Sequence, residues 1–287
     1  MDDTPTGNPE QAQYWETRAT SWIEAEGYTA LISSSFGRRA MESLALTPGA
    51  VVLDVGCGTG PTTLTIADTV APGGRVLGVD ISATMIVAAR ERAAAAPVAG
   101  VDVDFAVADA QVDDLGAGAF DAVFSQFGVM FFADPEAAFA NLHAALRPGG
   151  RLAVACWADL FSNEWMLVPG SAVIEVTGQP PPMPGPAEPG PFSLADAERV
   201  EQLLVGAGFG SISVTPSNAQ VEIAEDQIDH AVAGSSRTGA VRAALDANPD
   251  PEFRDRLLAA VRAAFLARVR DGRMVLAASA HIVTAVA

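Results

Sequence analysis

Lysine is absent from this 287-residue chain, so its 17 basic residues are all arginines, and 35 acidic residues bring the formal net charge to −18. Proteins that bind nucleic acid need a basic face to neutralise phosphates, and an anionic membrane surface attracts the same kind of face. Neither nucleic acid nor a membrane is therefore an expected partner.

Cysteine and histidine are scarce as well. The two cysteines, Cys57 and Cys156, cannot build a disulfide framework and fit a reducing compartment. The amino terminus lacks the basic stretch and apolar core of a signal peptide, and no uncharged apolar run reaches the ~18 residues of a membrane-spanning helix. Cys, His, Asp and Glu do not cluster at metal-ligand spacing. We expect a cytoplasmic, metal-free protein, either a monomer or a homodimer.

A short hydrophobic run leads into a glycine-rich turn. Residues 51–55 are too few and too β-branched for a helix, which predicts a buried parallel strand. Gly56, Gly58 and Gly60 follow, so the backbone can take positive φ and a ligand can approach without meeting β-carbons. Pro61 then suits the first turn of a helix. The glycine-rich turn therefore predicts a site where a ligand binds directly against the main chain.

A carboxylate stands where nucleotide-binding α/β folds place one for ribose hydroxyls. Asp80 follows the strand-like run 75–79, twenty positions after Gly60. Two cofactor classes fit this arrangement, namely dinucleotides such as NAD and S-adenosylmethionine. A dinucleotide fingerprint needs a third glycine where this chain has Pro61, which disfavours NAD.

Predicted strands and helices alternate along the rest of the chain. Further strands are expected at 75–79, 101–107, 120–124, 152–157, 211–223 and 274–286, and helices at 61–70, 82–95, 135–146 and 194–205. This order predicts a Rossmann-like, doubly wound α/β fold with a seven-stranded sheet, mostly parallel with an antiparallel last strand. The carboxyl ends of its strands face the binding crevice. The residues expected there are Gly56 to Gly60, Asp80, Asp109, Ser125 to Phe127 and Trp157.

Composition divides the chain into four parts. They are an N-terminal helical lid at 1–45, the Rossmann-like core at 46–160, a proline-rich loop at the pocket rim at 161–192, and a C-terminal helix and strand pair at 193–287 with a helical cap insertion at about 225–272. The lid is expected as two helices that meet at Gly27. Seven prolines between residues 178 and 191 exclude a helix there, and Ser193 is the expected cap of the next helix.

Five segments resemble, in order and spacing, the motifs of the class I S-adenosylmethionine-dependent methyltransferases. They are residues 52–60 (VLDVGCGTG), 77–82 (LGVDIS), 108–111 (ADAQ), 120–128 (FDAVFSQFG) and 146–152 (LRPGGRL). The resemblance covers residues 10–287, and the whole order is similar to a bacterial subgroup that methylates small molecules. It implies S-adenosylmethionine as cofactor and a small-molecule substrate.

The resemblance also implies a set of cofactor contacts. The set is Tyr14, Trp22, Asp54, Gly56, Cys57, Gly58, Thr59, Gly60, Asp80, Ile81, Met85, Asp109, Ala110, Ser125 and Gln126. Asp54 with Gly56 and Gly58 would hold the methionine end, Ser125 would border it, Asp80 would bind the ribose, and Asp109 with Ala110 the adenine. Ile81 and Met85 would enclose the adenine ring or belong to the core. Tyr14 and Trp22 would reach down from the lid, unless the lid helices simply pack on the sheet.

The acceptor pocket is expected to be apolar and aromatic. Its expected lining is Gln126, Phe127, Met130, Phe131, Trp157, Phe161 and Trp165. This lining favours a hydrophobic or aromatic acceptor, although Met130 and Phe131 fit the core equally well. No catalytic residue is identified, because a base is needed only for a protonated nucleophile. His230, in the acidic insertion, is the candidate.

Three other functions remain open beside methyl transfer. The lack of a clear base motivates an enzyme that uses a bound sulfonium in a rearrangement without transfer. A non-catalytic binding protein is the second, although the intact glycine loop and Asp80 argue against it. An NAD-dependent oxidoreductase is the third, disfavoured by Pro61.

Overall fold

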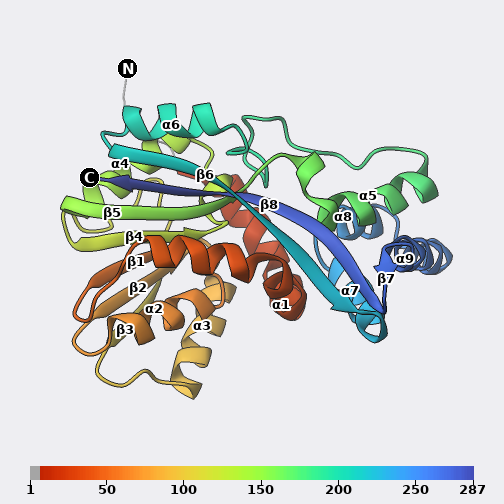
Figure 1. Ribbon diagram of the computed structural model, residues 1–287, viewed down its shortest axis with the longest axis horizontal. Helices are drawn as coiled ribbons and strands as arrows, with labels where there is room; N and C mark the ends of the chain where they lie inside the picture. Colours follow the sequence, from red (N-terminus) through yellow and green to blue (C-terminus); the bar gives the residue numbers. More distant parts are fainter. Residues whose placement is uncertain (1–6) are drawn as a thin grey trace.

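The structure, a computed structural model, describes residues 7–287 and is built around one mixed sheet (Figure 1). The strands are β1 (Val51–Val55), β2 (Arg75–Asp80), β3 (Asp102–Val107), β4 (Phe120–Gln126), β5 (Leu146–Trp157), β6 (Gly210–Ala224), β7 (Val269–Arg270) and β8 (Arg273–Val286). Over this range the strand order is β3-β2-β1-β4-β5-β8-β6, and the two-residue β7 pairs with β8. The chain therefore winds outward in both directions from β1 and β4, which is where such sheets bind ligands.

Strand directions confirm the expected fold class. Strands β1 to β5 are parallel, β8 is antiparallel to β5, and β6 is antiparallel to β8. The seven expected strands and the antiparallel last strand are confirmed, and β7 is an addition. Strand β6 is the outer strand, and its pairing with β8 stays in register through Pro216. An edge strand tolerates proline because the missing N–H can face solvent.

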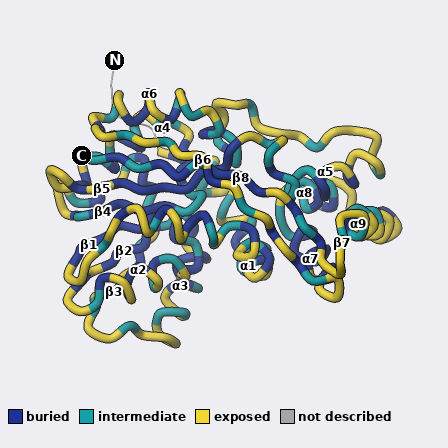
Figure 2. Tube along the Cα trace, in the orientation of Figure 1, coloured by how far each residue is buried: buried dark blue, intermediate teal, exposed yellow. Residues whose placement is uncertain are grey.

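Helices cover both faces of the sheet. They are α2 (Pro61–Val70), α3 (Ala83–Ala95), α4 (Pro135–Ala145) and α6 (Ala197–Gly206). Ser82 and Asp134 cap α3 and α4, since their side chains accept hydrogen bonds from Met85 N and Ala137 N. Right-handed crossovers place α2 and α3 on one face and α4 and α6 on the other. Figure 2 shows the central strands buried beneath exposed helix surfaces, as a sheet covered on both faces requires.

The N-terminal lid is one helix, α1 (Pro9–Ser43), so the expected break at Gly27 is wrong. A glycine inside a helix costs only ~1 kcal/mol relative to alanine, and the packing of Tyr28, Ile32 and Phe36 in the core offsets that cost. The first part of α1 lies beside the C-terminal insertion, and the second part runs along the face of the sheet (Figure 1). The first six residues of the expected lid lie outside the described residues.

The insertion before the last strand is helical, as expected. It contains the 3₁₀ turn η3 (Glu225–Gln227) and helices α7 (Ile228–Ser235), α8 (Gly239–Ala247) and α9 (Pro251–Leu266).

The expected rim loop, in contrast, holds the 3₁₀ turn η2 (Leu160–Ser162) and a full helix, α5 (Glu164–Thr177), which packs on α8 and α9. Residues 178–191 form neither helix nor strand, as their prolines predict. Helix α6 begins at Ala197 with Asp196 as its cap, so the expected start at Leu194 is wrong.

Candidate functional site

The glycine loop turns sharply between β1 and α2. Gly56, Gly58 and Gly60 have φ of 67°, 56° and 82°, in the left-handed region that favours glycine. The N–H groups of Gly56 and Cys57 donate to Val79 O at 2.8 and 3.0 Å, which fixes the loop to β2. A β-carbon on Gly58 would meet no described atom within 4 Å. The loop is therefore anchored on one side and leaves open space at Gly58.

The tip of β4 touches this loop backbone to backbone. A β-carbon on Gly128 would lie 2.9 Å from Val55 O and 3.0 Å from Gly56 Cα. Ser125 is buried, and its hydroxyl donates to Val55 O at 2.7 Å. The hydroxyl expected to border a ligand's methionine end is thus used to join β4 to β1.

Asp54 lies beneath the loop and not on its open side. Its Oδ2 accepts hydrogen bonds from the Thr62 and Thr63 hydroxyls, both at 2.7 Å, and so ties β1 to the first turn of α2. Its Oδ1 is buried and has no hydrogen-bond partner among the described residues. Burial raises the pKa of Asp54 to about 6, the threonine hydroxyls oppose the shift, and the charge of Asp80 adds to it. One carboxylate oxygen thus has a structural role, and the contact of Asp54 with the methionine end stays a prediction.

The raised pKa of Asp54 predicts how stability depends on pH. A raised folded-state pKa stabilises the protein at low pH, and the contribution is lost as the pH rises through about 6. The free energy of unfolding of the ligand-free protein should fall between pH 4 and pH 7.5 by about 3 kcal/mol from this group, at about 1.4 kcal/mol per pKa unit. Asp54→Asn should remove this component in urea unfolding, whereas the exposed Asp102→Asn should keep it. If the free energy of unfolding of Asp54→Asn fell with pH as steeply as that of the wild-type protein, the assignment would be contradicted.

Asp80 ends β2 beside the loop, as predicted. Its Oδ2 accepts from Gly58 N and its Oδ1 from Ser82 N, both at 2.9 Å. Burial raises the pKa of Asp80, against the effect of these backbone donors. Ile81 beside it is partly buried and Met85 is buried. The carboxylate joins the glycine loop to the start of α3.

Asp109 meets the beginning of the chain. Its Oδ1 accepts from Gln111 N at 3.0 Å, and its Oδ2 accepts from Asn8 N at 2.7 Å. The side-chain oxygen of Asn8 in turn accepts from Ala133 N at 3.1 Å, and Ala110 is buried beside Asp109. The residues just before α1 therefore cross the carboxyl ends of β3 and β4.

Two glutamates of α1, absent from the sequence prediction, bind the same loops. Glu16 accepts from the Ser82 hydroxyl at 2.7 Å and from Thr84 Oγ1 at 2.6 Å, and these hydrogen bonds lower its pKa. Glu26 accepts from the Thr59 hydroxyl and from Arg92 Nη2 at 2.5 Å. Burial alone would raise the pKa of Glu26, but the bonds from Arg92 and Thr59 lower it overall. Helix α1 thus holds both the glycine loop and the start of α3.

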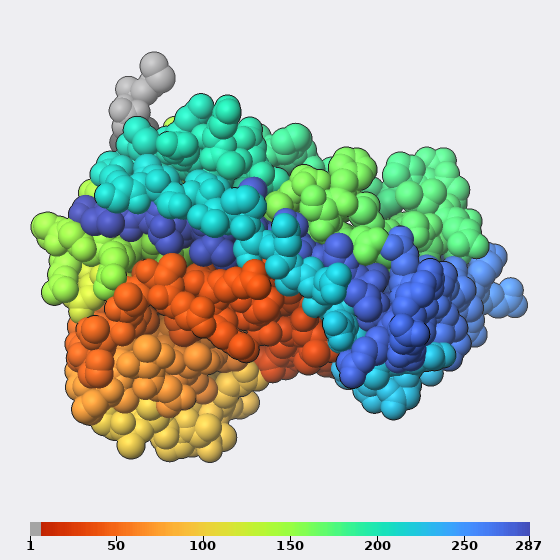
Figure 3. Space-filling view, viewed as in Figure 1, coloured from red at the N-terminus to blue at the C-terminus, as the bar shows by residue number. Residues whose placement is uncertain are grey.

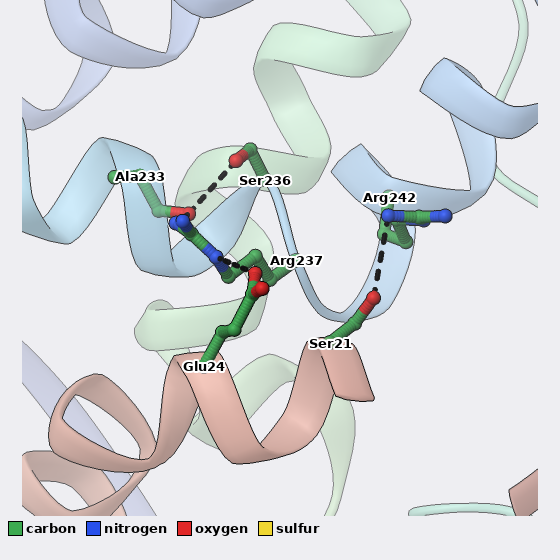
Figure 4. Close-up of polar contacts among 6 residues, drawn as sticks. All are labelled: Ser21, Glu24, Ala233, Ser236, Arg237 and Arg242. Atoms are coloured by element: carbon green, nitrogen blue, oxygen red, sulfur yellow. Dashed lines mark hydrogen bonds and ion pairs between the residues drawn. The ribbon is translucent and has the colours of Figure 1, made fainter. Parts of the chain in front are cut away.

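The opposite side of α1 contacts the insertion (Figure 4). Arg237 Nε lies 2.9 Å from Glu24 Oε2, and Arg242 Nη1 donates to the Ser21 hydroxyl at 3.3 Å. Tyr28 packs against Gly234, where a β-carbon would lie 2.4 Å from Tyr28 Cβ and Cγ. In Figure 3 the red and orange surface of α1 crosses the molecule between the core and the blue insertion. One helix therefore links the insertion to the glycine loop and the start of α3.

Other aromatic residues of α1 are arranged differently from the prediction. Tyr14 is exposed, and the Arg18 guanidinium lies 4.0 Å from its ring centroid. Trp15, which was not predicted, packs edge-to-face on Phe131 at 4.8 Å, and Trp22 packs on Trp15 at 5.3 Å. Trp15 is therefore the α1 aromatic that meets the 3₁₀ turn η1 (Val129–Phe131) after β4.

The expected pocket residues separate into three groups. Phe127, Trp157 and Trp165 form one aromatic cluster with Phe36. Met130 belongs to the core, where its Sδ accepts from Trp157 N at 3.3 Å. Phe161 is 83% exposed on η2, so the prediction that it lines an enclosed pocket is wrong.

Gln126 and His230 both face α1. The Gln126 amide packs against Gly37 and donates to Ser33 Oγ at 3.4 Å. His230 lines a cavity of about 190 Å³ with Leu31, Glu222 and Gln227. None of the other expected site residues lines that cavity, and a catalytic role for His230 stays a prediction. Within residues 7–287, no group of three His, Cys, Asp or Glu side chains gathers as metal ligands, and no helix is long and apolar enough to cross a membrane.

Comparison with known proteins identifies the central part of the chain. Residues 52–150 match the family model described as a methyltransferase domain. The demethylmenaquinone methyltransferase of Thermus thermophilus is 43% identical over 103 residues, which are 36% of this chain and 45% of that protein. The chain spans half or less of the length of the first curated relatives it matches.

Two solved structures share the fold. The phosphoethanolamine N-methyltransferase 2 of Haemonchus contortus, in complex with S-adenosylmethionine, has a TM-score of 0.57 at 19% identity and covers 96% of this chain and 57% of its own. The alignment with the [4+2]-cyclase SpnF has a TM-score of 0.59 at 18% identity, and it covers 99% of this chain and 97% of the cyclase. At these identities the likeness shows the fold alone.

Proposed function

We propose that this protein transfers a methyl group from S-adenosylmethionine to a small hydrophobic or aromatic acceptor, because residues 52–150 match the methyltransferase-domain family model. The observation that carries the proposal is the glycine loop, which is open at Gly58 and joined to the Asp80 carboxylate at 2.9 Å. The bound cofactor supplies an activated methyl group on a sulfonium centre.

The residues at the strand ends fit this cofactor. Gly58 leaves space that a β-carbon would restrict, and the Asp80 and Asp109 carboxylates can accept hydrogen bonds from hydroxyl and amino groups. We assign the ribose hydroxyls to Asp80, the adenine to Asp109 and Ala110, and the methionine end to the backbone of Gly56 and Gly58. Helix α1 serves as a lid, since Glu16 and Glu26 hold it over both loops.

Cofactor binding tests the proposal. Titration calorimetry should show binding of S-adenosylmethionine and of its demethylated product. Asp80→Ala should weaken both by at least tenfold, because hydrogen bonds to a charged group contribute ~1.5–3 kcal/mol. Asp102→Ala, at an exposed ion pair on the same sheet, should leave the affinity within twofold. If the wild-type protein bound neither compound, the proposal would fail.

A rearrangement that uses the bound cofactor without methyl transfer is the second candidate. The full-length fold shared with a [4+2]-cyclase motivates it, since this fold is compatible with chemistry other than transfer. Incubation with a methyl-labelled cofactor and cell extracts separates the two. A labelled small molecule supports transfer, whereas bound cofactor with no labelled product favours the rearrangement.

A further inference from the structure

Phe127 has a backbone conformation that bulky residues rarely adopt. Its φ is 61°, in the left-handed region, and its N–H donates to Ala155 O at 2.9 Å. A non-glycine residue in this region is uncommon, and such strain costs ~1–3 kcal/mol. Strained residues persist where the surrounding structure holds them, and they cluster at functional sites. The contacts around Phe127 must therefore hold it in this strained conformation.

Phe127 lies beside the loop assigned to the methionine end. It directly precedes Gly128, whose α-carbon would lie 2.9 Å from a β-carbon on Gly56. On its other side, Gln126 packs against Gly37 of α1. Phe127 is thus one residue from the backbone contact that joins β4 to the glycine loop, which is where an acceptor must approach an activated methyl group.

The Phe127 ring forms the outer layer of a fixed aromatic stack. It lies parallel to Trp157, with ring centroids 3.9 Å apart and an interplanar angle of 13°. Trp157 is 6% exposed and held edge-on by Phe36 at 5.5 Å, whereas Phe127 keeps part of its surface accessible. Trp157 is therefore held in place, and Phe127 is the more exposed ring of the pair.

A buried amide steadies the far side of the stack. Trp165 lies 4.9 Å from Trp157, and its indole N–H donates to Asn163 Oδ1 at 3.0 Å. Asn163 is fully buried and also donates to Ser279 O and accepts from Ser279 N, both at 3.0 Å. Because this network fixes the indole rings, little rotamer entropy remains to be lost when a ligand binds.

We propose that Phe127 determines acceptor specificity by stacking on a planar aromatic ring. This inference rests on the proposed methyl transfer. The left-handed backbone places the ring against Trp157, next to the loop that holds the methionine end. A planar acceptor extends the existing stack, whereas a saturated ring of the same outline does not. Aromatic pairs contribute ~0.5–1.5 kcal/mol beyond the area they bury, which corresponds to about 2- to 12-fold in affinity.

Two ligands of matched outline test the assignment. Calorimetry with saturating S-adenosylhomocysteine would compare 2,3-dihydroxynaphthalene with cis-decahydronaphthalene-2,3-diol. The wild-type protein should bind the planar diol about fivefold more tightly. Phe127→Leu should abolish this preference by weakening the planar diol alone. Phe161→Leu, at an exposed phenylalanine outside the stack, should keep it.

The outcomes separate this assignment from the proposed function. Retained S-adenosylhomocysteine binding by Phe127→Leu shows that the variant is folded. Equal affinities for the two diols in the wild-type protein, a preference that survives in Phe127→Leu, or no binding of the planar diol at millimolar concentration would each overturn the role of Phe127. If the wild-type protein did not bind S-adenosylhomocysteine, the proposed function would be overturned, and the role of Phe127 with it.

Discussion

Gly128→Ala should reduce cofactor affinity by at least tenfold and lower the free energy of unfolding by about 1–3 kcal/mol, the usual cost of overpacking. The new β-carbon would lie 2.9 Å from Val55 O and 3.0 Å from Gly56 Cα. Both neighbours are backbone atoms that cannot rotate away, so either β4 or the glycine loop must shift. Calorimetry with S-adenosylmethionine and urea unfolding measure the two effects.

A second glycine supplies the matched control. Gly170 lies inside α5, and a β-carbon there would meet no atom within 4 Å among the described residues. Gly170→Ala should leave cofactor affinity unchanged and stabilise the protein by up to about 1 kcal/mol, because alanine favours a helix. If Gly128→Ala behaved like Gly170→Ala, the contact between β4 and the glycine loop would have no energetic importance.

Gly234→Ala should destabilise the contact between α7 and α1. A β-carbon at this position would lie 2.4 Å from Tyr28 Cβ and Cγ, which are held by the buried side of α1. Helix α7 must move away from α1, at a cost of about 1–3 kcal/mol and a fall in melting temperature of about 2–12 °C. Thermal unfolding measures the loss, and limited proteolysis should show faster cleavage between residues 225 and 250.

The ion pair between Glu24 and Arg237 in Figure 4 should contribute less to stability than the packing of Tyr28 on Gly234. Glu24 and Arg237 keep 55% and 36% of their side-chain surface exposed, and such pairs contribute about 0–1 kcal/mol. Glu24→Gln should therefore shift the melting temperature by no more than about 2 °C. A larger loss in Glu24→Gln than in Gly234→Ala would mean that charge, not packing, joins the lid to the insertion.

The fold was predictable because its signals are local. Short apolar runs that alternate with helical stretches predicted the order of the strands, and the glycine-rich turn predicted where the first strand ends. The errors arose where tertiary packing overrides local preference. Gly27 does not break α1 because Tyr28 and Ile32 are buried beside it. Helix α5 contains Pro169 and precedes a proline-rich stretch, so its sequence resembles a loop.

The site was predictable where backbone carries the function, and less so where side chains from distant segments meet. Glycine spacing located the loop, and strand ends located Asp80 and Asp109. Glu16 and Glu26 could not be found, because glutamates on an amphipathic helix usually face solvent. The direction of the Asp54 carboxylate depends on Thr62 and Thr63, which carry no separate sequence signal.

The outermost strand has a consequence for self-association. Strand β6 is 15 residues long, and a strand of that length with one unpaired side could recruit further chains into a growing aggregate. Pro216, near its middle, removes a hydrogen-bond donor that such a template would need. A proline in an outer strand is one of the ways in which natural sheets limit edge-to-edge pairing.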